Sequence, residues 1–271
     1  YEVFEQDPVK YKSYQAAIYQ AMQGFLDKRM DDTERTFVIL VAGAGRGPLV
    51  TACLGAYRQI NKSFLCLIYA IEKNPSAVLY LKSKQRGDWK DAPVSVVQSD
   101  LRKLTTKQIT ETVDLVVSEL LGSFGCNELS PECLDELMKS DICGPGTVSI
   151  PNKYTSYAAP VCSMKLYHNV VLQAMYPDEC DGPTAVNGLT KAMETPYVVR
   201  PHMASQTHPA KDCWSFVHEQ EDESMGATLE RSCRLKFAVD LSYASSFGCG
   251  YGAMDTTIDP IFHGSQLSPV A

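Results

Sequence analysis

The chain has 271 residues, and its hydrophobic fraction of 45% and charged fraction of 21% are ordinary values for a globular protein. At roughly 150 residues per domain, this length corresponds to one large domain or two modest ones. The formal net charge of −7 excludes an overall basic surface for nucleic acid and favours a cationic partner.

The first 150 residues alternate between apolar runs of strand length and segments with helical periodicity. Asp7 and Pro8 have the character of a helix start, and the apolar residues that follow predict a helix over residues 8–29. Strands are predicted over residues 37–41, 64–71, 94–97, 113–117 and 147–150. Further helices are predicted over residues 49–58, 75–84 and 132–139, and Ser130-Pro131 starts the last of them. Because the strands are continuous apolar runs that alternate with helices, we expect a parallel α/β sheet with helices on both faces.

After residue 150 the character of the sequence changes. Prolines recur, helical periodicity weakens, and short β-rich runs occupy residues 197–199, 214–217 and 235–239. We therefore expect a second, mainly β domain that begins near residue 151. Residues 176–194 are rich in Gly, Pro and Asp, which predicts an exposed arm or a long loop.

The cysteines and the longest apolar run bear on where the protein works. None of the ten cysteines forms a C-x-x-C pair, and several lie in apolar runs, so we expect reduced core cysteines in an intracellular protein and no metal site. The longest apolar run, residues 64–71, is much shorter than the roughly 20 residues of a membrane-spanning helix, so no membrane partner is expected. Since the chain starts at Tyr1 rather than Met, we expect it to be part of a longer protein.

Three features at the ends of successive strands together predict a nucleoside site. Gly43, Gly45 and Gly47 form a turn after the first strand, where glycine lets a ligand approach the backbone closely. Glu72 ends the second strand and could accept both hydroxyls of a ribose, and Asp100 ends the third and could accept an adenine amine. No Walker lysine is present, so S-adenosylmethionine, which carries adenine and ribose but no phosphate, fits best. The alternatives are a tight turn without a ligand and a glutamate that stabilises a helix N-terminus.

Two glutamates, Glu119 and Glu128, bracket a short loop directly after the strand over residues 113–117. Ligands of open α/β sheets bind at the carboxyl ends of the strands. Two carboxylates that converge there suit a guanidinium, whose planar donors match carboxylates in a bidentate way. The alternative is that both are solvated loop acids.

Four ordered motifs carry a resemblance to a known family. They are Gly43-Ala44-Gly45-Arg46-Gly47-Pro48, Glu72-Lys73-Asn74-Pro75, Ser118-Glu119-Leu120-Leu121-Gly122-Ser123 and Asn127-Glu128-Leu129-Ser130-Pro131-Glu132-Cys133. Together they resemble the protein arginine N-methyltransferases, most closely the type II enzymes that make symmetric dimethylarginine. Residues 1–5, 151–156 and 196–200 are similar to that type too, and the resemblance extends to about residue 240.

The resemblance implies a fold and a role for each matching residue. It implies a helical segment over residues 1–35 that closes over the cofactor, a Rossmann-like S-adenosylmethionine domain over residues 36–150, and an incomplete β-barrel domain for substrate and dimerisation over residues 151–271. Gly43, Gly45 and Pro48 would line the methionine part of the cofactor, Tyr1 and Lys10 would reach its sulfonium end and carboxylate, Glu72 would hold the ribose, and Asp100 and Leu101 would frame the adenine. Glu119 and Glu128 would clamp the substrate guanidinium, and Phe4 resembles the phenylalanine that distinguishes the symmetric enzymes, unless it is simply a core residue.

The same resemblance implies the activity and the partners. The expected reaction is methyl transfer from S-adenosylmethionine to arginine in histone tails and arginine/glycine-rich RNA-binding proteins, in the cytoplasm and the nucleus. A homodimer or higher oligomer is expected, formed through an arm at residues 163–195, and a β-propeller adaptor would bind only a longer chain. The alternatives are a non-catalytic scaffold that binds the cofactor or arginine-rich tails, and a small-molecule methyltransferase, against which the two glutamates argue.

Overall fold

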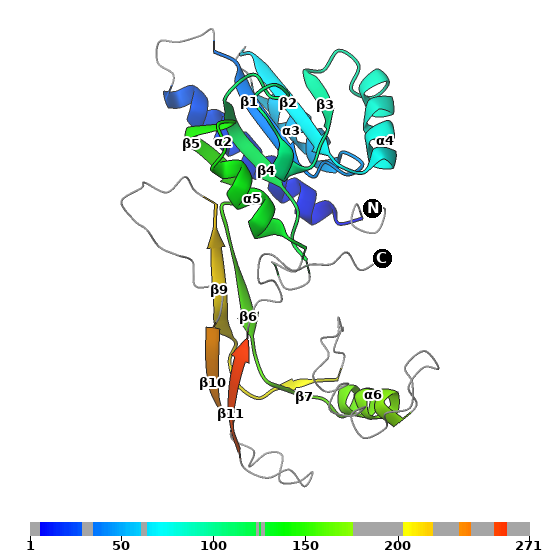
Figure 1. Cartoon of the computed structure of the whole chain (residues 1–271), viewed down its shortest axis with the longest axis vertical. Helices are drawn as coiled ribbons and strands as arrows, with labels where there is room; N and C mark the ends of the chain where they lie inside the picture. The colour runs from blue at the N-terminus through cyan, green and yellow to red at the C-terminus, as the bar shows by residue number, and fades with distance from the viewer. Residues whose placement is uncertain are drawn as a thin grey trace. The chain divides into compact units, whose positions relative to one another are not determined.

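The computed structural model describes residues 6–28, 35–60, 64–122, 125, 128–175, 203–218, 233–239 and 252–258 (Figure 1). The predicted roles of Tyr1 and Phe4, the arm at residues 176–194 and the strand at residues 197–199 lie outside these residues. The chain forms two compact units. Among the described residues, the first contains residues 6–154 and 215–218, and the second contains residues 155–214 and those from 233 onward.

The first unit is built on a parallel sheet of five strands, as the sequence predicts. The strands are β1 (Phe37–Ala42), β2 (Cys66–Glu72), β3 (Val94–Gln98), β4 (Val113–Ser118) and β5 (Cys143–Ile150), in the order β3-β2-β1-β4-β5. Every neighbouring pair is parallel, and all six residues of the central strand β1 are buried. Since the strand order reverses beside β1, the crevice at its carboxyl end is where such a sheet binds a ligand.

Helices cover both faces of this sheet (Figure 1). Ile39 and Val41 of β1 pack into one apolar cluster with residues of α2 (Pro8–Lys28), α3 (Pro48–Gln59) and α4 (Pro75–Arg86). The alternate residues of β1, Val38 and Leu40, pack into a second cluster with α5 (Ser130–Met138). Because successive side chains of a strand point to opposite faces, one apolar run supplies both halves of the core.

The observed helices differ from the predicted ones by up to two residues at their ends, and local chemistry sets the boundaries. α4 begins where the Asn74 side chain accepts a hydrogen bond from the Ser76 N–H at 3.0 Å, with Pro75 in the first turn. α5 begins at Ser130-Pro131, as predicted, and the preceding Leu129 adopts a left-handed conformation with φ of 64°. That conformation is strained for a residue with a side chain and turns the chain sharply into the helix.

The chain after residue 150 is partly β-structured, as predicted, and also contains a helix that the sequence did not predict. β6 (Lys153–Ala158) pairs with β9 (Lys211–Val217), β7 (Val161–Cys162) with β8 (Ser205–Gln206), and β10 (Cys233–Val239) with β11 (Gly252–Ile258). The unpredicted helix is α6 (Met164–Met175), which begins where the Ser163 hydroxyl accepts a hydrogen bond from the Leu166 N–H at 3.3 Å. This serine cap was a usable signal, but Val170 and Val171 weaken the helical pattern. The closed barrel stays a prediction.

The turn between β1 and α3 requires glycine at position 47. Gly47 has a φ of 90°, and a Cβ atom there would lie within 2.8 Å of Cζ2 of the buried Trp89. Gly146 has a similar φ of 108° but has no atom within 4 Å of an added Cβ. A substitution at Gly146 therefore introduces backbone strain alone, whereas one at Gly47 introduces backbone strain and steric overlap.

We expect Gly146→Ala to lower the free energy of unfolding by about 1 kcal/mol through backbone strain. Gly47→Ala should cost about 1–3 kcal/mol more, because Trp89 must also move. Urea denaturation of both variants measures the difference. Equal losses for the two substitutions would show that Trp89 yields without cost.

Candidate active site

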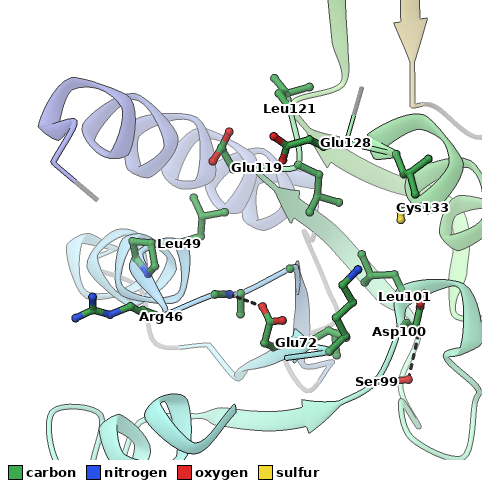
Figure 2. Close-up of a pocket in the computed structure, with 18 of the residues that line it drawn as sticks. Arg46, Leu49, Glu72, Ser99, Asp100, Leu101, Glu119, Leu121, Glu128 and Cys133 are labelled. Atoms are coloured by element: carbon green, nitrogen blue, oxygen red, sulfur yellow. Dashed lines mark hydrogen bonds between the residues drawn. The ribbon is translucent and has the colours of Figure 1, made fainter. Parts of the chain in front are cut away.

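A cavity of about 350 Å³ lies at the carboxyl ends of the central strands of the first unit (Figure 2). Eight of the predicted site residues line it: Gly43, Gly45, Pro48, Glu72, Asp100, Leu101, Glu119 and Glu128. They come from the ends of β1, β2, β3 and β4 and from the loop before α5. The structure thus gathers residues that are up to 85 positions apart in the chain, since Gly43 and Glu128 line the same cavity.

The glycine turn forms one wall, and a neighbouring loop approaches it closely. Gly43 has a φ of 71°, and a Cβ atom there would lie 2.6 Å from Cδ2 of Leu120, the residue after Glu119. The Ala44 N–H donates to the Ile71 carbonyl at 2.8 Å, which ties the turn to the end of β2. Glycine at position 43 therefore lets the turn, the end of β2 and the glutamate loop meet without a side chain between them.

Glu72 is buried in this wall, with 6% of its surface exposed. One carboxylate oxygen accepts from the Gly45 N–H at 2.8 Å, and the other accepts from the Asn74 N–H at 2.8 Å. Each oxygen keeps a further lone pair. The carboxylate is therefore fixed in position and still able to accept hydrogen bonds from a ligand in the cavity, such as a pair of ribose hydroxyls.

Asp100 lies at the end of β3, where its carboxylate is engaged by Arg102. It accepts from the Arg102 backbone N–H and Nε, each at 3.0 Å, and from Nη2 at 2.7 Å. These charge-assisted bonds lower the pKa of Asp100 from its ordinary 3.8 to about 2. The pair therefore stabilises the folded state at pH values above 3.8, and this contribution is lost as the pH falls through about 2. The predicted contact of Asp100 with an adenine amine stays a prediction, since Arg102 already occupies part of its acceptor capacity.

The two glutamates lie on the same side of the cavity, across from Glu72 (Figure 2). Glu119 follows β4 directly and is partly buried, whereas Glu128 is exposed and precedes the strained Leu129. Nζ of Lys10, in α2, lies 3.4 Å from a carboxylate oxygen of Glu119. In this structure Lys10 thus provides a positive charge beside one of the two carboxylates. Its contact with a cofactor stays a prediction.

Tyr14 links α2 to the base of the glutamate loop. Its hydroxyl donates to the Ser118 carbonyl at 2.7 Å, immediately before Glu119. Burial, followed by the nearby carboxylate of Glu119, raises the pKa of Tyr14, so this hydroxyl keeps its proton and stays a donor at neutral pH. The helix therefore holds the start of the loop through a neutral hydrogen bond and the end of the Glu119 side chain through Lys10.

Several residues of the cavity wall carry no role in the sequence prediction, among them Tyr11, Arg46, Lys73, Arg102 and Cys133. Each lies within two positions of a predicted residue or inside one of the quoted motifs, which is the signal that could have found it. Arg46 is turned outward in Figure 2, with its guanidinium 4.7 Å from the centre of the Tyr80 ring. The lining residues combine four carboxylates with three cations, and the carboxylates of Glu119 and Glu128 lie together.

The donors and acceptors of this cavity suit a nucleoside better than a metal or a phosphate. Among residues 6–28, 35–60, 64–122 and the other described ranges, no group of three His, Cys, Asp or Glu side chains could hold a metal ion. No helix in the described part of the chain is long and apolar enough to cross a membrane. The wall offers a narrow glycine turn beside a fixed, buried carboxylate, which is an arrangement that binds a ribose.

Solved structures with the same architecture define the class of the fold. The chain matches the Trypanosoma brucei PRMT1 enzyme-prozyme heterotetrameric complex with AdoHcy at a TM-score of 0.61, with 12% identity over 84% of this chain and 64% of that one. It matches PRMT6-SAH at a TM-score of 0.54, with 14% identity over 86% of this chain and 69% of that one. The fold is therefore the Rossmann-like fold of S-adenosylmethionine-dependent methyltransferases. Residues 1–150 match the model of the PRMT5 arginine-N-methyltransferase family, and the chain belongs to this family.

The second part of the chain and the curated relatives agree with that family. Residues 153–253 match the model of the PRMT5 oligomerisation domain. Protein arginine N-methyltransferase 5 of Xenopus laevis is 41% identical over 256 residues, which are 93% of this chain and 36% of that protein. The protein of the same name from Oryza sativa subsp. indica is 36% identical over 93% of this chain and 35% of its own length. The chain thus spans about a third of the length of these relatives.

We expect Glu72→Gln to lower the free energy of unfolding by about 1–3 kcal/mol. The amide NH₂ group cannot accept a hydrogen bond, so one of the two backbone N–H groups that donate to the carboxylate would lose its acceptor. Glu136→Gln, on the exposed side of α5, is the matched control and should change stability by no more than about 0.5 kcal/mol. Urea denaturation of both variants measures the effect. A Glu72 variant as stable as the control would mean that water replaces the lost acceptor.

Proposed function

We propose that this chain forms the catalytic core of an S-adenosylmethionine-dependent protein arginine N-methyltransferase that makes monomethyl and symmetric dimethyl arginine. One observation carries the proposal: the paired glutamates and the nucleoside cradle line the same cavity. A cationic acceptor and a nucleoside cofactor would therefore meet within it. Membership of the PRMT5 family supports the same reaction.

The cofactor would lie along the wall that the glycine turn and Glu72 form. Gly43, Gly45 and Pro48 would contact its methionine part, Glu72 its ribose hydroxyls, and Asp100 with Leu101 its adenine. Tyr1 and Lys10 are proposed for the sulfonium end and the carboxylate. When bound, S-adenosylmethionine supplies an electrophilic methyl group on a sulfonium.

Glu119 and Glu128 would bind and orient the substrate guanidinium. A free guanidinium has a pKa above about 12, so it is protonated at neutral pH and is a poor nucleophile. Two carboxylates that accept from its N–H groups hold positive charge away from the attacking nitrogen and fix that nitrogen toward the methyl group. Such positioning contributes several kcal/mol, up to about 7–11 kcal/mol in ideal cases. Methyl transfer would leave the cofactor as the thioether S-adenosylhomocysteine, and Glu119 or Glu128 would accept the proton that the nitrogen loses and pass it to solvent.

Lys10 gives the site a way to hold Glu119 before the substrate binds. Its ammonium is 3.4 Å from the Glu119 carboxylate, which reduces the repulsion between Glu119 and Glu128. An arginine side chain has five donors in a planar fork, whereas a lysine has a point charge. The guanidinium can therefore bind the Glu119 and Glu128 carboxylates at once, whereas the Lys10 ammonium contacts Glu119 in this structure.

We expect Glu119→Gln and Glu128→Gln each to abolish methyl transfer to an arginine/glycine-rich peptide and to leave cofactor affinity within a few fold, because neither carboxylate belongs to the nucleoside cradle. A tritiated methyl-transfer assay and calorimetric cofactor titration measure the two quantities. Turnover by the purified double variant would contradict the proposal. Cofactor binding without turnover by the unmutated protein would favour the non-catalytic scaffold.

Phe4 is the residue we propose for product specificity. Phe4→Met should introduce asymmetric dimethylarginine, because the asymmetric relatives that the sequence resembles carry methionine at this position. Mass-spectrometric fragmentation of the dimethylated peptide distinguishes the two products. Phe4→Leu is a control for loss of the ring without the thioether. An unchanged product in both variants would assign Phe4 to core packing.

Protein partners follow from the same proposal. Arginine-rich histone tails and arginine/glycine-rich RNA-binding proteins would be substrates, in the cytoplasm and the nucleus. The match to the PRMT5 oligomerisation domain supports self-association of the chain. We place the contact in a homodimer or higher oligomer at α6, where Met164, Tyr167 and Leu172 are 65%, 56% and 40% exposed. Exposed apolar side chains grouped on one helix are typical of a protein interface.

A further inference from the structure

A histidine that lies outside the cavity is completely buried in the first unit. His218 follows β9, and its side chain has 0% of its surface exposed. Among the described residues, neither ring nitrogen has a partner in hydrogen-bond geometry. A buried polar group in that state destabilises the folded protein. Such a residue needs a physical explanation, because native proteins pair nearly all of their buried polar groups.

The surroundings of His218 hold its ring in one orientation. Its backbone N–H donates to the Asn152 carbonyl at 2.8 Å. Its ring packs against Tyr154, with 5.3 Å between the ring centroids, and Tyr154 packs in turn against Phe216 at 5.3 Å. In this orientation Nδ1 lies 3.5 Å from Oδ1 of Asp135, which a small rotation of either side chain converts into a charge-assisted hydrogen bond.

Asp135 belongs to α5, the helix that follows Glu128. Glu128 and Leu129 directly precede the first residue of α5, Ser130, so the position of the helix determines where the Glu128 backbone lies. Another side of α5 packs into the core through Leu134 and Leu137. Apolar packing has little directional preference, whereas a hydrogen bond to a carboxylate is directional. The contact with His218 can therefore fix the rotation of α5 about its axis, which the apolar contacts alone leave loosely defined.

We propose that His218 is a positioning residue that sets the place of Glu128 through Asp135 and α5. It touches neither substrate nor cofactor. The proposal rests on the proposed function of Glu128 and goes beyond it, since it assigns a requirement for catalysis to a segment 90 residues further along the chain. A segment far along the chain would then be needed for an active guanidinium clamp.

Two substitutions separate the hydrogen bond from the packing of the ring. His218→Phe keeps an aromatic ring against Tyr154 and removes the donor. His218→Asn removes the ring and keeps an amide donor at the position of Nδ1. If His218 acted only by packing, the asparagine variant would be the damaging one. If it acts through Asp135, the phenylalanine variant is.

We expect His218→Phe to lower kcat on an arginine/glycine-rich peptide by roughly tenfold or more, because a displacement of about 1 Å in a positioning group has effects of this size. The Kd for S-adenosylhomocysteine should stay within about twofold, since neither His218 nor Asp135 lines the cavity. His218→Asn should unfold at a lower temperature and keep a kcat close to that of the unmutated protein. Asp135→Ala should lower kcat as His218→Phe does, and the double variant should lose no more than either alone.

Amide hydrogen exchange over residues 128–138 provides a readout that does not depend on turnover. His218→Phe and Asp135→Ala should accelerate exchange there, and His218→Asn should not. An unmutated protein that transfers no methyl group overturns the proposed function, while the exchange pattern still decides the role of His218. An active protein in which His218→Phe keeps both its kcat and its exchange rates, or in which His218→Asn is the damaged variant, overturns the positioning role.

Discussion

The Glu72 carboxylate is the interaction on which the organisation of the cavity depends. It accepts one backbone N–H from the glycine turn after β1 and another from the start of α4, both at 2.8 Å. These two segments follow adjacent strands of a parallel sheet, so their ends already lie near each other. The carboxylate satisfies two donors that helix starts and tight turns leave open, and these backbone donors hold it in turn. A single buried acid thus joins the two parts of the nucleoside cradle.

The four acids of the cavity differ in what surrounds them, and that difference separates their roles. Glu72 is fixed by backbone donors and Asp100 by Arg102, so both serve as parts of a rigid frame. Glu119 has Lys10 as an exchangeable partner, and Glu128 is exposed to solvent. The acids that would meet the substrate are therefore the ones whose neighbours a guanidinium can replace. Glu72 and Asp100 would keep their positions when a ligand binds, whereas Glu119 and Glu128 would exchange their present neighbours for the guanidinium.

The way α5 is held connects this clamp to a distant part of the chain. The left-handed conformation of Leu129 joins Glu128 to the helix, and His218 lies against Asp135 on that helix. Strain at Leu129 persists only where the surrounding structure fixes the backbone firmly. The buried histidine and the apolar side of α5 are the elements that provide this restraint. The position of Glu128 is then set by how α5 is held in the fold.

The sequence by itself determined the parallel sheet, the order of its strands along the chain and the cavity residues that end those strands. It could do so because continuous apolar runs of strand length, a glycine turn and acids at strand ends are local patterns, and a parallel sheet brings the ends of its strands to one edge. It did not determine α6, whose two adjacent valines weaken the helical pattern, or the left-handed conformation of Leu129 before α5. Only the tertiary structure decided that Lys10 reaches Glu119 across 109 positions and that His218 is buried beside Asp135. These contacts join residues that are far apart in the sequence, and no local sequence pattern links them. They form only when the packing of the folded chain brings the segments together.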